Sequence, residues 1–464
     1  MNYNGAKAEN IKIAYIGGGS RGWAWGLMSD LVSCDDISGE VYLYDIDFKA
    51  AENNEIIGNK FKTAPGAKSD WSYKASKTIG EALTGADFVI ISILPGTFDE
   101  MESDVHAPEA YGIYQPVGDT TGPGGIVRAM RTIPMFEEIG ENIKKYAPDA
   151  WVINYTNPMT LCIKALYRVF PDIKAFGCCH EVFGTQKLLT EVVKEKLGAE
   201  AVERHEIKVN PVAVNHFTWL TEATYKNIDL FPYYREFCEE YKDGYSKDKP
   251  VDSNWMNNFF YSEEKVKMDL FRKFGWIAAA GDRHLAEFCE GSWYLESPER
   301  VREMHFSLTT VSWRKKDLKD RLEKSRKYIS GELPVQITPT GEEGVNQMRA
   351  LLGLCELVTN VNIPNRGQIP NLPKDAVVET NAVFRAGSLS PVFAGEIPSS
   401  IYPLVSRICS EQELAAEGIA ERDTDKIFVA FANDPLVTCT IESARKLFNE
   451  MCRNTEKYLT MYTL

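Results

Sequence analysis

The predicted fold follows from residues 11–45, which have the sequence IKIAYIGGGSRGWAWGLMSDLVSCDDISGEVYLYD. Ile11–Ile16 is a short apolar strand, a glycine-rich turn follows it, and Trp23–Val32 has the composition of a helix. A second strand over Glu40–Tyr44 ends directly before Asp45. Strand, glycine turn, helix, strand and acid stand in the order of a dinucleotide-binding unit. We therefore expect a Rossmann-type domain at the N-terminus.

The turn itself predicts the cofactor. Gly17, Gly19 and Gly22 match the pattern Gly-x-Gly-x-x-Gly, and Ser20 lies in the same turn. These glycines allow a tight turn, close approach of the backbone to a pyrophosphate, and close packing of helix on strand. A carboxylate at Asp45 accepts hydrogen bonds from ribose hydroxyls and repels a 2′-phosphate, so we predict NAD rather than NADP. The alternative is a turn that only connects two elements.

The alternation of strand and helix continues beyond this unit. Further apolar runs occupy Asp87–Leu94, Trp151–Tyr155 and Ile173–Gly177, and amphipathic stretches occupy Arg128–Tyr146 and Met159–Phe170. Strands that alternate with helices indicate a doubly wound parallel sheet covered on both faces.

The pattern changes after about Leu197, where we place a domain boundary near residue 200. Asn227–Ser262 is rich in aromatic and charged residues, and Glu411–Asn433 has the pattern of one long helix. We expect an NAD-binding domain over 1–200. An α+β domain for substrate binding, catalysis and oligomerisation is expected over 201–464.

Composition restricts the class of protein. The chain has 464 residues, of which 44% are hydrophobic and 25% charged, as in a globular protein. A net charge of −14 argues against a general nucleic-acid binder. No apolar run approaches the ~20 residues of a membrane helix, and the polar start, Met1–Asn10, has no signal-peptide core. Ten scattered cysteines without a Cys-x-x-Cys pair indicate free thiols. We expect a cytoplasmic protein without a membrane partner.

Four segments carry residues capable of chemistry. They are Asn154–Pro158, Cys178–Val182, Val214–Trp219 and Gly281–Phe288. The first two follow predicted strands, where ligands of open α/β sheets bind. Each also has a structural interpretation: an Asx-type turn, packed cysteines, a hydrogen-bonded structural histidine, and a helix start with Asp282 as its N-cap.

Together these segments resemble glycoside hydrolase family 4, whose members depend on NAD and a metal. The resemblance spans most of the chain. Its segments are Ile16–Gly22, Asp119–Gly125, Arg128–Pro134, Asn154–Pro158, Cys179–Val182, Asn215–Trp219, Gly281–Phe288, Asn362–Pro373 and Val377–Glu379. The resemblance implies a fold like that of lactate and malate dehydrogenases.

The resemblance also suggests a substrate. Cys-His-Glu-Val at Cys179–Val182 is similar to the version found in α-galacturonidases. Members with other residues after the cysteine act on α-galactosides, α-glucosides, α-glucuronides or 6-phosphoglycosides. The implied activity is hydrolysis of short α-galacturonides, and the alternative is hydrolysis of another α-glycoside. Asp119 stands where many members carry Glu, and we expect it to act in catalysis.

The mechanism implied by the resemblance is a transient oxidation. NAD oxidises C3 of the sugar, a base removes the C2 proton, the leaving group departs from C1, and water adds before the hydride returns. The resemblance assigns Mn²⁺ to Cys179 and His216, where it acts as a Lewis acid. Asp282 is the expected C2 base, although several relatives use Tyr. His180 is the expected proton donor to the leaving oxygen.

Substrate contacts are expected from four further residues. Asn157 would hold sugar hydroxyls, and Glu181 would orient a donor or a water. The planar guanidinium group of arginine can donate two hydrogen bonds to a C6 carboxylate. Arg128 and Arg283 are therefore both candidates to bind it. Family habit implies a homodimer or homotetramer. The rival functions are a 2-hydroxyacid dehydrogenase, which consumes NAD, and a protein that senses NAD without catalysis.

Overall fold

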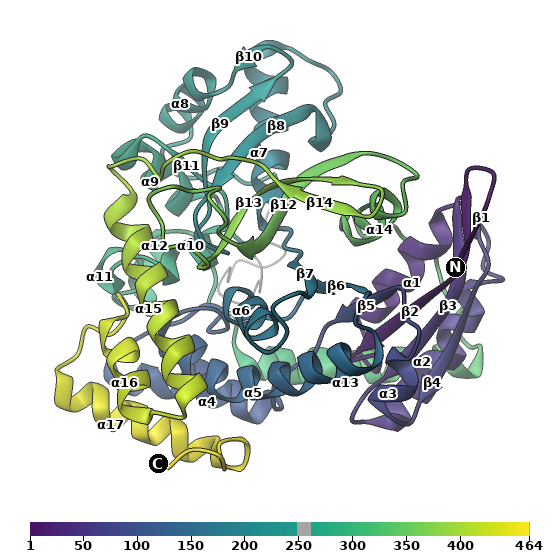
Figure 1. Cartoon of the computed structure of the whole chain (residues 1–464). Coiled ribbons are helices and arrows are strands. Elements are labelled where there is room, and N and C mark those ends of the chain that lie inside the picture. Colours follow the sequence, from purple (N-terminus) through teal and green to yellow (C-terminus); the bar gives the residue numbers. More distant parts are fainter. Residues whose placement is uncertain (248–260, 464) are drawn as a thin grey trace.

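A ten-stranded sheet extends from the middle of the molecule to one side of it, where β1 to β4 lie (Figure 1). The computed structural model describes residues 1–247 and 261–463. Six strands of the sheet are parallel, in the order β4-β3-β2-β5-β6-β7. They are β2 (Lys7–Ile16), β3 (Ile37–Tyr44), β4 (Trp71–Ser76), β5 (Phe88–Ile91), β6 (Trp151–Asn154) and β7 (Lys174–Gly177). The predicted Rossmann-type sheet is confirmed.

Helices cover both faces of this sheet. Within β2, Ala14 and Ile16 point into one core, whereas Ile13 and Tyr15 point into the other, because side chains alternate along a strand. The helices of this half are α1 (Trp23–Ser33), α2 (Phe48–Phe61), α3 (Ile79–Leu83), α4 (Phe98–His106), η1 (Ala107–Tyr111), α5 (Gly122–Tyr146) and α6 (Met159–Val169). Both faces are therefore buried, as the alternation of strand and helix predicts.

Four further strands join the sheet, each through antiparallel pairing. From the second half of the chain, β12 (Leu357–Pro364) joins the edge at β7, and β13 (Val377–Arg385) and β14 (Ser388–Pro391) follow it. The N-terminal β1 (Asn2–Asn4) pairs with β2. One sheet thus contains residues from both halves of the sequence.

A smaller antiparallel sheet lies in the second half. It consists of β8 (Ile207–Val212), β9 (Trp219–Tyr225), β10 (Ile228–Asp229) and β11 (Ile277–Ala278). Its core is shared with helices α7 (Glu181–Leu197), α8 (Phe231–Glu240) and α9 (Lys265–Phe274). The short helix η2 (Arg204–Glu206) precedes β8. An α+β second half agrees with the expectation. Residues 248–260 of the aromatic-rich segment Asn227–Ser262 lie outside the described residues.

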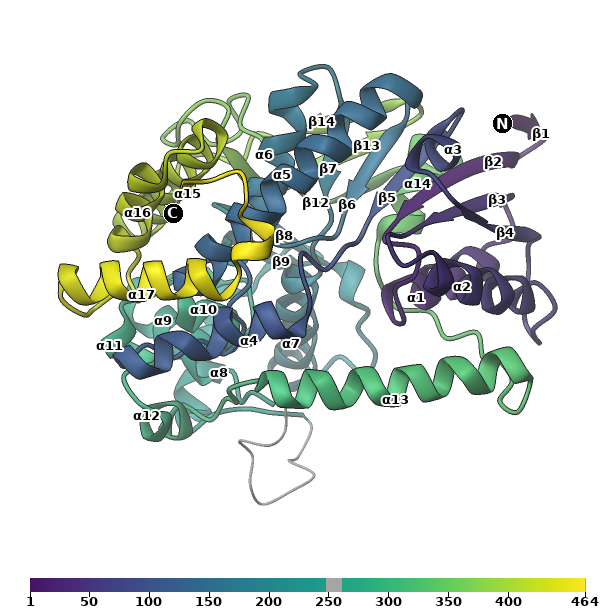
Figure 2. The same cartoon turned by 90° about the horizontal axis from the view of Figure 1, so that it is seen from below.

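The remaining helices complete the molecule. They are α10 (Asp282–Glu287), α11 (Gly291–Tyr294), α12 (Pro298–Glu303), α13 (Val311–Ser330), α14 (Gly344–Leu351), α15 (Tyr402–Glu421), α16 (Thr424–Asn433), α17 (Ile441–Asn454) and η4 (Glu456–Tyr458). Helix α13 runs along one side of the molecule, from α4 to α2 (Figure 2). Among the described helices, none is long and apolar enough to cross a membrane.

The single helix predicted over Glu411–Asn433 is wrong. Helix α15 ends at Glu421, and α16 starts at Thr424. Arg422 adopts a left-handed conformation (φ 61°) that stops α15, and the Asp423 side chain accepts hydrogen bonds from the backbone N–H groups of Asp425 and Lys426. An N-cap of this kind starts a new helix.

Candidate active site

The glycine turn has the geometry of a dinucleotide site. Gly17 has φ 91°, and a Cβ there would lie 2.0 Å from the carbonyl oxygen of Ser92. A Cβ on Gly19 would lie 2.8 Å from Asp45 Oδ2, which accepts the Gly19 N–H at 2.9 Å. Side chains are therefore excluded where a pyrophosphate would approach the backbone. Gly22 directly precedes α1, whose N-terminal N–H groups suit a phosphate.

A cavity of about 320 Å³ adjoins this turn. The residues that line it include Gly22, Trp23, Thr340 and Glu342. Tyr155, which follows β6, also lines it, and its ring lies 5.3 Å from that of Trp23. This volume is within the range of small-molecule sites. Because Gly22 and Tyr155 follow the carboxyl ends of β2 and β6, the cavity borders that end of the parallel strands.

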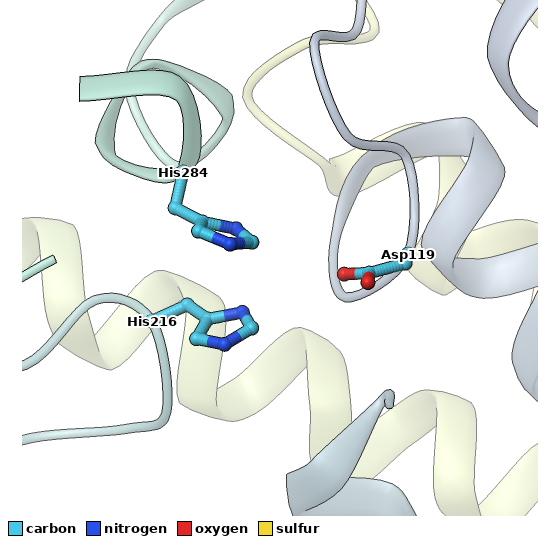
Figure 3. A group of neighbouring side chains, drawn as sticks. All are labelled: Asp119, His216 and His284. Atoms are coloured by element: carbon cyan, nitrogen blue, oxygen red, sulfur yellow. The ribbon is translucent and has the colours of Figure 1, made fainter. Parts of the chain in front are cut away.

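A second group of side chains brings together Asp119, His216 and His284 (Figure 3). One ligand atom of each residue lies within 4.8 Å of those of the others. Asp119 comes from the loop before α5, His216 from the loop between β8 and β9, and His284 from α10. The two imidazole rings lie 3.9 Å apart, and the carboxylate faces them across a gap. One oxygen and two nitrogen donors form a set that transition metals accept.

The electrostatics of this group favour metal binding. Burial, together with the neighbouring His284, lowers the pKa of His216 to about 4. Burial also lowers the pKa of His284. Burial by itself would raise the pKa of Asp119, but Arg128, His284 and His216 lower it below its usual range. At neutral pH the group thus offers two neutral imidazoles and one carboxylate, the forms that bind metals.

Residues of two other segments hold this group in place. Thr120 Oγ1 lies 3.0 Å from His216 Nδ1 and donates to Asp119 Oδ1 at 2.7 Å. Asn157 Nδ2 donates to Asp119 Oδ2 at 3.2 Å, and its backbone carbonyl accepts from Arg128 Nε. Asn157 Oδ1 is buried and has no partner among the described residues. The structure thus joins Asn157 and Arg128 to Asp119, and leaves an acceptor for a hydroxyl.

His180 and Glu181 connect the cavity with the three-residue group. His180 Nδ1 lies 3.1 Å from Glu342, which lines the cavity, and its Nε2 lies 3.8 Å from Glu181. The hydrogen bond to Glu342 raises the pKa of His180. Glu181 also lies 3.7 Å from His284 Nε2 and accepts the Gly281 N–H. A chain of acids and imidazoles therefore runs from the cofactor side to the metal-competent group.

Cys179 lies close to this network but outside the three-residue group. It is buried, and its backbone carbonyl accepts from Asn360. Burial, Glu379 and Glu181 raise the pKa of its thiol well above the ordinary value. A cation would favour the thiolate, which is the form that binds metals. The structure thus brings His216 together with Asp119 and His284, and places Cys179 beside Glu379.

Asp282 and Arg283 are occupied by structural contacts. Asp282 is fully buried, and its oxygens accept hydrogen bonds from Ser262 and from the N–H groups of Val266 and Lys267 at the start of α9. Its carboxylate therefore caps α9, and the N-cap of α10 is Gly281 rather than Asp282. Arg283 donates to the carbonyl of Pro116 and to Thr309.

Two family models cover most of the chain. The model for family 4 glycosyl hydrolases matches residues 12–195, and the model for their C-terminal domain matches residues 212–437. The chain belongs to family 4 of the glycosyl hydrolases. It is a glycoside hydrolase, as the resemblance implied.

Known proteins resemble this family 4 chain over its whole length. An α-galacturonidase from Thermoanaerobacterium saccharolyticum is 60% identical over 460 residues, which cover 99% of this chain and 98% of the relative. The crystal structure of a putative glucosidase from Bacillus subtilis has a TM-score of 0.90 at 51% identity, and covers 96% of this chain and 100% of that one. A 6-phospho-β-glucosidase from Thermotoga maritima, solved with manganese, NAD⁺ and glucose 6-phosphate, shares the fold, with a TM-score of 0.75 at 22% identity over 97% and 99% of the two chains.

Sequence analysis of this family 4 hydrolase missed His284 and Glu342. His284 lies in the quoted segment Gly281–Phe288, but a run of charged residues there is typical of an exposed helix start. Its companion His216 adopts φ 64°, a left-handed conformation that is uncommon for a non-glycine residue and clusters at functional sites. That backbone signal exists in the structure alone. No motif indicates Glu342, which reaches His180 from a distant segment.

Proposed function

We propose that the protein is an α-galacturonidase that works with NAD and a divalent metal, Mn²⁺ by the resemblance. The observation that carries the proposal is the position of the metal-competent group, Asp119, His216 and His284, at the carboxyl end of β6, where Asn157 binds Asp119. The names of the full-length relatives support the galacturonide as substrate.

The residues present suit both cofactors. The turn can be this tight only with glycine, because a Cβ on Gly17 or Gly19 would collide with Ser92 or with Asp45. His284 Nδ1 is buried without a hydrogen-bond partner among the described residues, which is costly unless a ligand is bound. His216, Asp119 and His284 would hold the metal, with the Cys179 thiol as a further proposed ligand. NAD supplies a reversible hydride acceptor and the metal a Lewis acid.

The protein's own residues bind the sugar and move protons. Asn157 Oδ1 accepts a sugar hydroxyl, because this buried oxygen has no partner among the described residues. His180 donates a proton from Nε2 to the leaving oxygen, while Glu342 holds Nδ1 and so fixes the ring. Glu181 orients His180 and His284 from between them.

Asp282 stays our candidate for the C2 base. Burial and Glu264 raise its pKa to about 7, which suits a base at neutral pH. In this role its carboxylate would exchange at least one of its hydrogen bonds to the start of α9 for the sugar C2–H. Of the two arginines expected to bind the sugar carboxylate, Arg128 stays our candidate, whereas Arg283 donates to Pro116 and Thr309 instead.

Activity on a panel of substrates tests the proposal. Nitrophenyl α-glycosides and galacturonate oligomers are incubated with NAD, Mn²⁺ and a reductant. We expect hydrolysis of α-galacturonides that requires NAD and Mn²⁺ in catalytic amounts and produces no net NADH. Replacement of the C2 hydrogen by deuterium should slow this hydrolysis. Steady accumulation of NADH with a 2-hydroxyacid would instead identify a dehydrogenase. Faster hydrolysis of another α-glycoside would exclude the galacturonide as the preferred substrate.

Three broader expectations remain proposals. We propose a division near residue 200 into an NAD-binding part and a substrate-binding part. A homodimer or homotetramer is proposed from the resemblance, and light scattering tests it. A cytoplasmic location is proposed because all ten cysteines are free thiols, as in a reducing compartment.

A further inference from the structure

Helix α13 is fixed against the loop that carries Asp119. At its start, the Thr309 N–H donates to the carbonyl of Pro116, and the Val311 N–H donates to His106 Nε2. Arg283 binds the carbonyl of Pro116 and the hydroxyl of Thr309 together, so it ties the two segments to each other. Arg314, one turn into α13, is thereby placed beside the site, where its charge interacts with that of Asp119.

Around Arg314 and Asp119, positive charge exceeds negative charge. Arg128 is 5% exposed, and its Nη1 makes no hydrogen bond within the described chain. The Nε of Arg314 is also buried without a hydrogen-bond partner among residues 1–247 and 261–463. By contrast, Arg131 forms a two-fold contact with the carboxylate of Asp104. A buried arginine is normally paired with a carboxylate, as Arg131 is, because an unpaired buried charge is costly.

The acids near the two arginines do not restore the balance. Asp119 is shared with the two histidines and with Asn157. Burial raises the pKa of Glu287 to about 8, so it is largely protonated at neutral pH. Asp317, on the next turn of α13, is ion-paired with Arg321. The charge of Arg314 also acts on Arg128, so an anion bound between the two guanidinium groups would supply the missing negative charge.

We propose that Arg314 is a specificity-determining residue that, together with Arg128 Nη1, binds the anionic group at C6 of the sugar. The inference rests on the proposed function and adds to it the residue that selects an acidic sugar. A carboxylate has two oxygens in a plane, which match the planar donor fork of arginine. A sugar phosphate is also an anion that arginine binds well. The experiment below therefore compares a C6 carboxylate with a C6 phosphate. Arg283 positions α13 rather than binding the substrate.

Comparison of acidic and neutral sugars tests this assignment. For wild type, Arg314→Gln and Arg314→Lys, kcat/KM is measured on the nitrophenyl α-glycosides of galacturonate, galactose and 6-phosphogalactose. The matched control is Arg326→Gln, an exposed arginine further along α13 that is ion-paired with Glu323. We expect Arg314→Gln to lower kcat/KM on the galacturonide about 30-fold or more, the scale of a charge-assisted hydrogen bond. Activity on the galactoside should change less than about threefold, and Arg314→Lys should retain an intermediate preference.

Binding of free D-galacturonate, measured by calorimetry in the presence of NAD, gives a second readout that needs no turnover. Arg314→Gln should weaken it by the same factor while NAD affinity stays unchanged. Equal losses on acidic and neutral sugars, or losses no larger than in Arg326→Gln, would overturn the inference. If wild type prefers the 6-phosphogalactoside and Arg314→Gln removes that preference, the anion site stands and the proposed substrate fails. If wild type binds and hydrolyses galacturonides and Arg314→Gln does so equally well, the proposed function stands and the role of Arg314 fails.

Discussion

Individual residues of the site are held in the charge states that a metal requires. His216 and His284 are kept neutral by burial, and the neighbouring Arg128 guanidinium keeps Asp119 ionised by holding its pKa low. The set is poorly satisfied by itself, because the two neighbouring imidazoles disfavour protonation of each other. In addition, His284 Nδ1 lacks a hydrogen-bond partner among the described residues. A bound cation satisfies all three groups at once.

The contribution of His284 to metal binding can be measured directly. His284→Gln is expected to weaken Mn²⁺ binding about tenfold or more, because it removes one nitrogen donor from the group. Mn²⁺ affinity is measured by electron paramagnetic resonance in the presence of NAD. His205→Gln, an exposed histidine of η2, serves as the control and should bind Mn²⁺ as wild type does. Unchanged affinity in His284→Gln would remove His284 from the metal site.

Cys179 allows a separate test of the thiolate ligand. Cys179→Ser should abolish turnover and leave NAD binding largely intact, because serine is a far weaker ligand than a thiolate. The neighbouring buried thiol provides a matched control, and Cys178→Ser should retain most of the activity. Turnover and NAD affinity are measured for both. Full activity in Cys179→Ser would contradict the assignment of the thiol to the metal.

Sequence predicted the glycine turn better than the metal-competent group. The turn is local, so the glycines and Asp45 are visible as spacing in one short segment. Asp119 and His216 come from two loops and His284 from α10, and these segments lie far apart in the sequence. Arg314 gave no signal at all, because α13 is rich in lysine and arginine along its length.

At the level of elements, the loop before α5 is held from two sides. Glu287 of α10 accepts the N–H groups of Val117 and Gly118. At the other end, Asp434 accepts the Gly122 N–H and the Thr121 hydroxyl. Both carboxylates are buried, and burial raises the pKa of each. The position of Asp119 therefore depends on acids that are not themselves at the reacting centre.

The protonation of Glu287 couples this loop to pH. Its pKa is raised from 4.5 in an exposed carboxyl to about 8 in the folded chain, so the folded state keeps a proton that the unfolded state releases. Its stabilising effect is therefore complete below about pH 4.5 and is lost as pH rises towards 8. The slope for one proton is about 1.4 kcal/mol per pH unit.

Glu287→Gln is expected to remove this part of the pH dependence, because the amide imitates the protonated acid. Thermal unfolding between pH 5 and 8 should show a shallower fall of Tm in Glu287→Gln than in wild type. Glu299→Gln, an exposed acid of α12, should leave the wild-type slope unchanged. A slope in Glu287→Gln equal to that of wild type would show that Glu287 does not hold the proton.

The break between α15 and α16 shows where element prediction failed. Apolar residues continue through the junction at a helical spacing, which favoured one helix over Glu411–Asn433. Within that pattern, Asp423 before Thr424 is a recognisable N-cap signal. The left-handed conformation of Arg422 could not be predicted from the sequence, because arginine has no preference for that conformation. Periodicity therefore identified the helical segment but not its interruption.

At the scale of the whole molecule, the sequence predicted the parallel sheet because each strand and its helix are consecutive. It could not predict that β12, β13 and β14 join the same sheet, since that pairing links segments far apart in the chain. Phe176 of β7 packs edge-to-face against Phe384 of β13, with ring centres 5.2 Å apart. The second half of the chain thus completes the core of the first.

This shared sheet sets a limit on how the protein can be divided or recombined. A fragment cut near residue 200 would leave β7 as an uncovered edge and Phe176 without its aromatic neighbour, which favours aggregation over folding. Exchange of specificity between relatives is therefore better attempted through individual side chains, or through α13, than by grafting one half onto another. The nucleotide-binding half shares its sheet with the second half, so we do not expect it to fold as a transferable module.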